Sequence, residues 1–173
     1  QVKRSPLADY EVSRYSKPIK TMNVKADDEM VYAQFVTEDT NVLLTLNTSH
    51  SLRFEMSDLP VTGVKTGGVK GIVVRENEFV ASVLVFKADT KEDLILVTQR
   101  GSIKRMSIAE IELSSRAKRG VVTLKELKAN PYRVFAMLFA KIGETIVMET
   151  EKGVQEEVQF VNLSRADRYS NGS

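Results

Sequence analysis

Short apolar runs separated by turn residues recur along the chain, and this pattern predicts β-strands rather than helices. Some runs are continuously apolar over about four residues, such as Leu94–Val97 and Ile146–Met148, which is typical of strands buried on both faces. The run near Gly101–Met106 alternates apolar and charged residues, as expected for a half-exposed strand. Helical periodicity is poor, and only residues 107–113 and 124–129 could form a turn of helix. Longer, partly aromatic runs predict further strands at Val31–Val36, Val80–Phe86 and Val134–Ala140.

A sequence repeat underlies these runs. When the chain is shifted by 101 residues, Val2–Arg4 falls on Ile103–Arg105 and the residues that follow match as well. Half of this offset gives a further copy, because Val42–Pro60 matches Leu94–Ile111, and Thr145–Phe160 is a third version. The repeat period is therefore about 51 residues.

This alignment assigns equivalent positions in the copies. It places Arg53 on Lys104, and it places His50, the only histidine, on the turn residue Gly101. We interpret His50 as a turn residue or an incidental neighbour of a phosphate, because nothing in the sequence places an oriented acid beside it for catalysis. The acidic run Asp27–Glu29 lacks the alternating ligand spacing of a calcium loop, so we expect no metal site there.

Four short strands in each unit of this length are typical of an all-β, propeller-like disc. Tryptophan is absent from the sequence, which argues against the WD40 and kelch types. We expect residues 1–173 to form one repeat domain, with a partial unit at 1–24 followed by units at 25–74, 75–125 and 126–173. Closed propellers have about four to eight blades, so we expect about three complete blades with partial units at the ends, a fragment of a larger disc.

Composition excludes several classes of site. The sequence contains no cysteine, which removes disulfides, thiolate metal sites and cysteine nucleophiles and is compatible with a reducing cytoplasm. No apolar run approaches the roughly 18 residues that a membrane-spanning helix needs. The formal net charge is only +2, so the position of the charges matters more than their sum.

The charges are segregated along the chain. Residues 100–128 contain eight lysines and arginines against three glutamates, whereas residues 144–157 contain five glutamates and one lysine. Basic residues recur on the third strand and on the crossover that follows it, so a disc would gather them into an arc on its rim. Such an arc suits contacts with the phosphates of a duplex, and a solvated surface is the alternative explanation. We predict phosphate contacts by Lys3, Arg4, Lys17, Lys20, Arg53, Lys65, Lys70, Arg100, Lys104, Arg105, Arg116, Lys118 and Arg119.

Three segments resemble the C-terminal domain of bacterial type IIA topoisomerase A subunits: "RYSKPIKTMNVKADDEMV", "TGVKTGGVKGIVVRENEFVASVLVF" and "TQRGSIKRMSIAEIELSSRAKRGVVTLKEL". The topoisomerase IV type is more similar than the gyrase type, because "KTGGVKG" (Lys65–Gly71) lacks the Gln-Arg-Arg opening of the gyrase box. The resemblance implies a β-pinwheel, in which one strand of each blade comes from a neighbouring unit. It also implies that duplex DNA is bound and bent around a basic rim.

The resemblance further implies a non-catalytic module of an ATP-dependent type II topoisomerase of the bacterial cytoplasm and nucleoid. The DNA-cleaving tyrosine would lie in the N-terminal region of the same polypeptide, and ATP and magnesium would bind other domains. Implied partners are DNA, that N-terminal region and the B subunit, with no membrane contact and no cofactor in this module. A propeller-like scaffold that binds an acidic protein surface is the alternative function.

Overall fold

The computed structural model describes residues 1–37 and 39–172, and its regular structure is almost entirely β, as predicted. The described residues contain four 3₁₀ turns: η1 (Leu7–Tyr10), η2 (Met56–Asp58), η3 (Ile108–Glu110) and η4 (Phe160–Asn162). The strands are β1 (Thr40–Leu46), β2 (His50–Glu55), β3 (Val80–Lys87), β4 (Asp93–Thr98), β5 (Ile103–Ser107), β6 (Val121–Val122), β7 (Val134–Ala140), β8 (Thr145–Glu149) and β9 (Gln155–Gln159).

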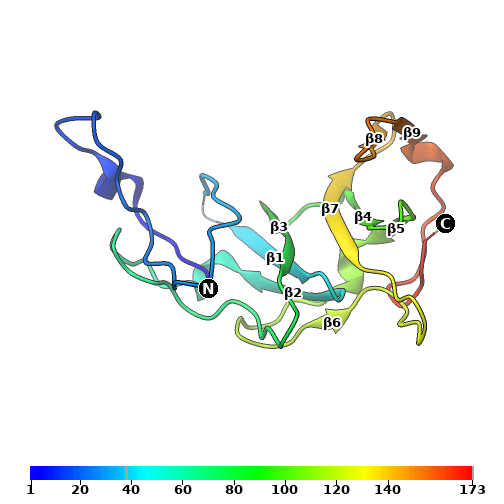
Figure 1. Cartoon of the computed structure of the whole chain (residues 1–173), viewed down its shortest axis with the longest axis horizontal. Helices are drawn as coiled ribbons and strands as arrows, with labels where there is room; N and C mark the ends of the chain where they lie inside the picture. Colours follow the sequence, from blue (N-terminus) through cyan, green and yellow to red (C-terminus); the bar gives the residue numbers. More distant parts are fainter. Residues whose placement is uncertain (38, 173) are drawn as a thin grey trace.

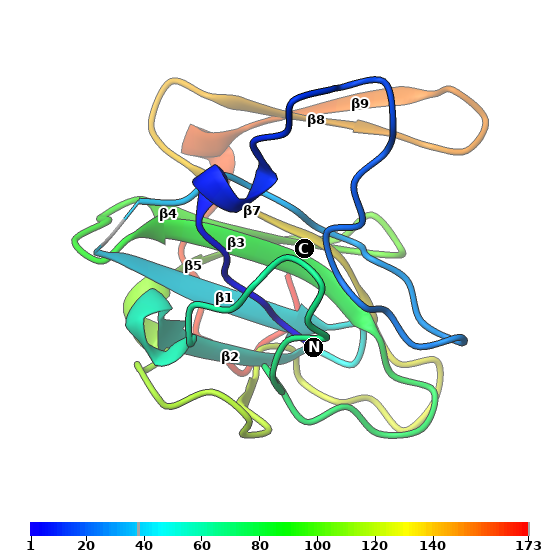
Figure 2. The same ribbon diagram turned by 90° about the vertical axis from the view of Figure 1, so that its left-hand side faces the viewer.

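The strands form sheets in the orders β3-β1-β2-β6, β5-β4-β7 and β8-β9, and all of these strand pairs are antiparallel. Strand β6 follows β4 and β5 in the sequence but pairs with β2, so the first sheet takes a strand from the next unit. The sheets follow a curve on which β3 and β7 lie against each other on the inner side, with β6 on the outer side (Figure 1). Figure 2 shows β3, β1 and β2 side by side, with β8 and β9 at the opposite end of the view from β2.

Apolar side chains pack between successive sheets. Leu43 of β1 and Leu94 of β4 belong to one buried cluster, and Ile95 of β4 and Ile146 of β8 belong to the next. Every residue of β1 and β4 is buried, which confirms the prediction for Leu94–Val97. Burial on both faces, predicted for Ile146–Met148, is wrong: β8 is buried only at Ile146, because among the described residues no further sheet covers its other face.

The strand predicted at Val31–Val36 is wrong. These residues form no strand, and Phe35 is 81% exposed. The strands with similar sequence, β3 and β7, each pair with a strand of a neighbouring hairpin. For 31–36 the described residues contain only the second strand of such a hairpin, at Val2–Arg4, so the apolar run has no strand edge to pair with.

The alignment of the repeats also needs a correction. Isolated parallel bridges join Arg4 to Val61, Arg53 to Leu113 and Arg105 to Arg165. Arg53 is therefore equivalent to Arg105, not to Lys104, and the hairpins are 52 rather than 51 residues apart.

The same correction moves His50 out of the hairpin turn. Ser49, with φ 71°, has the left-handed conformation of Gly101, with φ 79°, so it takes the turn position that the sequence alignment gave to His50. His50 is instead the first residue of β2. The predicted helical turn at 107–113 is present as η3, whereas 124–129 contains no helix.

Two crossover glycines allow a close approach of backbone to backbone. Gly68 and Gly120 have φ of 78° and 80°, and a Cβ at either position would collide with the carbonyl oxygen of Val2 or Ser51. The two glycines are equivalent residues of successive units. The chain that leaves each 3₁₀ turn can therefore lie directly against a strand of the preceding hairpin.

Candidate nucleic-acid interface

The segments that follow the 3₁₀ turns lie beside one another on the outer side of the curve. We call residues 19–24, 61–73, 113–125 and 165–172 the crossover edge. Its segments are joined by backbone hydrogen bonds, from Asn23 N to Thr66 O (3.0 Å), from Val73 N to Lys118 O (2.9 Å) and from Lys125 N to Ser170 O (3.4 Å). The lower side of Figure 1 shows the middle two segments following the curve.

Exposed lysines lie on adjacent segments of this edge. Lys65 and Lys70 are on one segment and Lys118 is on the next, with its ammonium 3.1 Å from Ser114 Oγ. Exposed Lys20 and Lys65 adjoin Thr21 and Val64, whose carbonyls both accept hydrogen bonds from the Lys3 ammonium, so their backbones lie on neighbouring segments. The structure therefore brings together four of the predicted phosphate contacts, and exposed Lys17 precedes this edge in the sequence.

Lys104 has a different role from the predicted one. It is 1% exposed, and its ammonium donates to the carbonyls of Thr123 (2.6 Å), Ser170 (3.0 Å) and Arg168. Burial lowers the pKa of Lys104 to about 8. An ammonium enclosed by carbonyls cannot reach a phosphate, so Lys104 is a structural residue that holds two crossover segments together.

Arg116 is also engaged by the backbone. It donates from Nε to Asp58 O and from Nη1 to Lys70 O, each at 3.1 Å. Arg168 makes the equivalent contact one unit later, with Val122 O. These arginines satisfy carbonyls of the preceding crossover segment, and they hold the exposed lysines of the edge in place.

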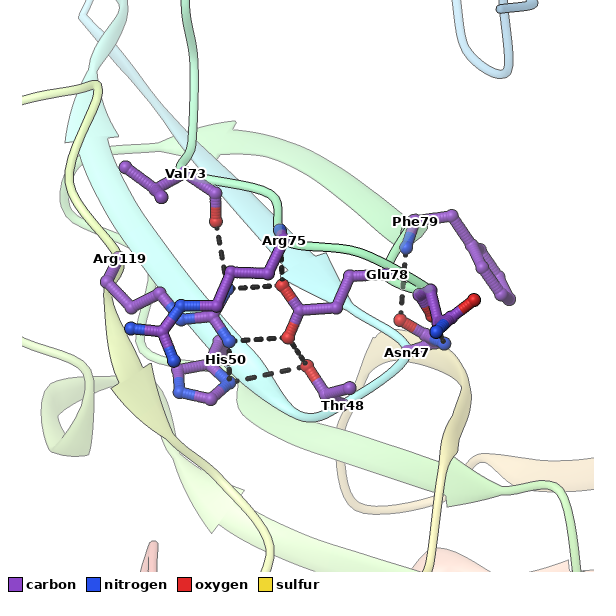
Figure 3. Close-up of polar contacts among 9 residues, drawn as sticks. Asn47, Thr48, His50, Val73, Arg75, Glu78, Phe79 and Arg119 are labelled. Atoms are coloured by element: carbon purple, nitrogen blue, oxygen red, sulfur yellow. Dashed lines mark hydrogen bonds and ion pairs between the residues drawn. The ribbon is translucent and has the colours of Figure 1, made fainter. Parts of the chain in front are cut away.

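Arg119 lies in a polar cluster beside the crossover edge (Figure 3). Its two terminal nitrogens bind the carboxylate of Glu78, and Nη1 also donates to Val73 O at 3.0 Å. Glu78 accepts further hydrogen bonds from the Thr48 hydroxyl (2.7 Å) and from the Arg75 backbone N–H (2.8 Å). Hydrogen bonding to Arg119 lowers the pKa of Glu78 to about 2.

The equivalent arginines of β2 and β5 stack on aromatic rings. The Arg53 guanidinium lies 5.5 Å from the centre of the Phe86 ring. Arg105 lies 4.1 Å from the centre of the Phe160 ring and pairs with Asp93 at 2.7 Å. Both side chains are half-buried, so they stabilise their blades and are poorly placed to bind a phosphate.

Half-buried Lys3 resembles Lys104, because its ammonium donates to the carbonyls of Thr21 (2.7 Å) and Val64 and so joins two crossover segments instead of making the predicted phosphate contact. The other two predicted cations lie elsewhere. Arg100 is exposed and stacks on Tyr132, 4.6 Å from the ring centre, at the turn between β4 and β5. Arg4 is half-buried, and its Nε has no partner among residues 1–37 and 39–172. Neither is joined to the lysines of the crossover edge by a hydrogen bond in that part of the chain.

Sequence reasoning missed exposed Lys125 and Arg165 on the edge, of which Arg165 pairs with Asp93 at 2.7 Å. Exposed Arg75, near the edge, was missed as well. It lies outside the repeated basic positions, and only the fold places it beside Arg119 and His50. The prediction for Arg119 depends on its charge and repeat position alone. A repeat alignment contains no signal that would place these two arginines beside the same histidine.

The acidic segment forms the hairpin β8–β9. Glu149, Glu156 and Glu157 are exposed on it, as are the apolar residues Val147 and Val154. Both views place this hairpin far from the crossover segments of the first two sheets (Figures 1 and 2). Basic and acidic surfaces are therefore separated in space as well as in sequence.

A family model described as "DNA gyrase C-terminal domain, beta-propeller" matches residues 1–37, 51–87 and 92–141. The chain belongs to this family. It is 40% identical over 172 residues to the A subunit of DNA topoisomerase 4 from Bacillus subtilis (strain 168), covering 99% of the chain and 21% of that relative. It is 31% identical over 173 residues to the corresponding protein of Staphylococcus aureus (strain MRSA252), again covering 99% and 21%. The chain thus spans about a fifth of the length of these relatives.

Solved structures agree with this family assignment. The crystal structure of the C-terminal domain of DNA topoisomerase IV superposes with a TM-score of 0.92 at 37% identity, covering 99% of the chain and 53% of that domain. A DNA gyrase A C-terminal domain superposes with a TM-score of 0.73 at 21% identity, covering 88% of the chain and 50% of that domain, which shows the fold alone. The predicted family and the β-pinwheel are confirmed. In the described part of the chain, no helix is long and apolar enough to cross a membrane.

Proposed function

We propose that the chain is a non-catalytic module of a type IIA topoisomerase that binds and bends duplex DNA. One observation carries the proposal: exposed Lys20, Lys65, Lys70 and Lys118 lie on adjacent, hydrogen-bonded segments along the outer side of a curved domain. In this proposal they contact phosphates, and the curve guides the bent duplex. The bound segment would then be presented for strand passage elsewhere in the enzyme.

Physical arguments support a sequence-independent mode of binding. A duplex carries one phosphate charge per roughly 1.7 Å of axis, so lysines on a continuous edge can replace several counterions at once. No recognition helix is present in the described residues, and the exposed groups on the edge suit phosphates rather than base edges. Bending a site of 20–30 base pairs costs on the order of 1–6 kcal/mol, which contacts along a curved edge can offset.

The relatives' name supports the wider context, which also remains a proposal. We propose that ATP, magnesium and the cleaving tyrosine belong to other parts of a topoisomerase IV, and that the B subunit and the N-terminal region of the same polypeptide are its partners. The bacterial cytoplasm, at the nucleoid, is the expected location. The division into units at 25–74, 75–125 and 126–173 is likewise proposed, with strands shared across the crossovers.

A salt titration of duplex binding tests the proposal. The variant Lys65→Ala/Lys70→Ala/Lys118→Ala is compared with wild type and with the control Lys141→Ala/Lys152→Ala, which removes exposed cations at the acidic hairpin. We expect the slope of log affinity against log salt to fall by about 3 for the first variant and to be unchanged for the control. Binding by wild type that does not weaken between about 50 and 200 mM salt would contradict a phosphate interface.

A protein-binding scaffold is the second candidate, favoured by exposed apolar side chains away from the crossover edge. Phe135 is 69% and Ile142 is 81% exposed, at the inner sheet strand and the following turn. If this surface carried the function, Phe135→Ser/Ile142→Ser would abolish capture of a partner protein and leave DNA affinity unchanged. Equal DNA binding by the triple lysine variant and wild type would favour this candidate.

A further inference from the structure

The polar cluster of Figure 3 contains a rigid base. Arg119 uses both terminal nitrogens on Glu78, and Glu78 is held in turn by Thr48 and by the Arg75 backbone. Arg119 comes from one crossover segment, whereas Glu78 precedes β3 and Thr48 lies in the turn between β1 and β2. The terminal nitrogens of Arg119 therefore fix the geometry of the cluster, while its buried Nε has no partner among the described residues.

His50 is oriented by this base. The Arg119 Nη2 lies 3.3 Å from His50 Nδ1, and the Thr48 hydroxyl, also 3.3 Å from Nδ1, already donates its proton to Glu78. Nδ1 therefore accepts from the guanidinium, and the proton of the neutral imidazole is on Nε2. Burial and the charge of Arg119 lower the pKa of His50, which agrees with a neutral ring. The ring is only half-buried, so Nε2–H is available as a donor.

Arg75 provides charge next to this donor. Its side chain is exposed and forms no ion pair with the described residues, and it is close enough to His50 to lower the pKa of the ring. Figure 3 shows the Arg75 guanidinium on the side of the cluster where His50 lies. The nearby Glu126, which also acts on His50, lies 3.8 Å from Arg133. The cluster therefore combines the unpaired guanidinium of Arg75 with the oriented N–H donor of His50.

We propose that Arg75 and His50 form a phosphate-binding site on the base made by Arg119 and Glu78, and that it holds a backbone phosphate of the bound duplex. The inference rests on the proposed DNA-binding function and adds a site that lies outside the repeated lysines. Its location supports the assignment, because Val73 N donates to Lys118 O, so Arg75 and Arg119 both lie within two residues of this contact on the crossover edge. A guanidinium suits a phosphate because its fork can bind two oxygens.

The single histidine makes the test direct. The imidazole signals of His50 are unique in the spectrum of the 173-residue chain, so they are followed by NMR while a short blunt duplex, and separately inorganic phosphate, are added. We expect the His50 signals of wild type to shift and saturate with the duplex, and to shift much less in Arg75→Ala. Duplex affinity of Arg75→Ala is expected to fall about three- to tenfold, and the salt slope to fall by about 1. Arg75→Lys should retain most of the salt slope, because the positive charge is kept, but it loses the guanidinium that can bind two phosphate oxygens.

Controls separate this inference from the proposed function. Arg75→Ala should keep the thermal midpoint of wild type, because only its backbone N–H contributes to the cluster. If Lys65→Ala/Lys118→Ala weakens duplex binding while Arg75→Ala and His50→Ala match the control Lys141→Ala, the site is overturned and the crossover edge remains. If wild type shows no salt-dependent duplex binding, the proposed function fails and this site fails with it.

Discussion

The crossover edge and the β8–β9 hairpin are built on the same repeat but differ in charge and in packing. On the crossover edge, the backbone is joined from segment to segment and cations such as Lys118 are exposed. On β8–β9 only Ile146 of β8 is buried, and the exposed positions carry Glu149, Glu156 and Glu157. The comparison shows that buried apolar residues and glycines keep the fold of the repeat. The exposed residues vary, so one fold carries a basic surface in one place and an acidic surface in another.

Equivalent basic positions teach a related lesson. Lys104 is enclosed by carbonyls, whereas Leu52 takes the corresponding place one unit earlier and is buried without charge. Lys3, the equivalent residue one unit before Leu52, also donates to carbonyls, those of Thr21 and Val64, so recurrence of a cation in a repeat does not by itself indicate a ligand contact. Some cations hold the crossover segments together, and the exposed ones are left for a partner.

The largest expected effect is on the free energy of unfolding, and it is seen by comparing a glycine of each region. Gly120 has φ 80° and lies against the Ser51 carbonyl. Gly153, in the β8–β9 turn, has φ 76°, but a Cβ at this position would have no other atom within 4 Å. We expect Gly120→Ala to lower the free energy of unfolding by more than about 3 kcal/mol, and Gly153→Ala by about 1 kcal/mol. Urea denaturation of both variants measures the difference, and equal losses would contradict the close approach on the crossover edge.

The next effect concerns the buried ammonium of Lys104. Its pKa is lowered to about 8 in the folded chain from 10.5, so between these pH values the unfolded chain binds more protons. The free energy of unfolding of wild type should therefore rise with pH across this window relative to Lys104→Met, by no more than about 3 kcal/mol. Denaturation at pH values of about 7, 8, 9 and 10 spans the titration and measures this rise, with Lys118→Met as the exposed control.

A smaller effect is expected at Glu78. Because Arg119 lowers the pKa of Glu78 to about 2 from 4.5, the stabilisation is complete above pH 4.5 and is lost as the pH falls toward 2. Glu78→Gln should lower the free energy of unfolding at neutral pH by about 1–2 kcal/mol and reduce the acid dependence. Glu76→Gln, at an exposed neighbour, is the matched control, and identical acid profiles for both variants would rule out the Glu78 contact as the source.

The smallest effect on stability is expected from reversing charge on the hairpin. Glu156→Lys/Glu157→Lys should change the free energy of unfolding by less than about 0.5 kcal/mol, because both residues are exposed on β9. Duplex affinity should rise about two- to fivefold at low salt, with a steeper salt slope. Urea denaturation measures the first quantity and fluorescence anisotropy the second, and the neutral pair Glu156→Gln/Glu157→Gln separates removal of repulsion from added attraction.

Much of the fold could be predicted from the sequence because strand burial follows local pattern. Val80–Phe86 and Val134–Ala140 became β3 and β7, and the continuous run Leu94–Val97 became the buried β4. Val31–Val36 has a comparable pattern but forms no strand, because a strand also needs an edge to pair with. The apolar pattern gives a segment the tendency to form a strand, and the presence of a strand to pair with decides whether it does.

The sequence by itself determined the all-β class, the repeat and the segregation of charge, because all three depend on the order of residue types along the chain. Only the tertiary structure decided which cations are exposed, since Lys104 and Lys118 differ in burial and not in residue type. It also brought Arg75 beside His50 and Arg119 from separate segments. Such juxtapositions arise from packing between distant residues, and a repeat in the sequence does not encode them position by position.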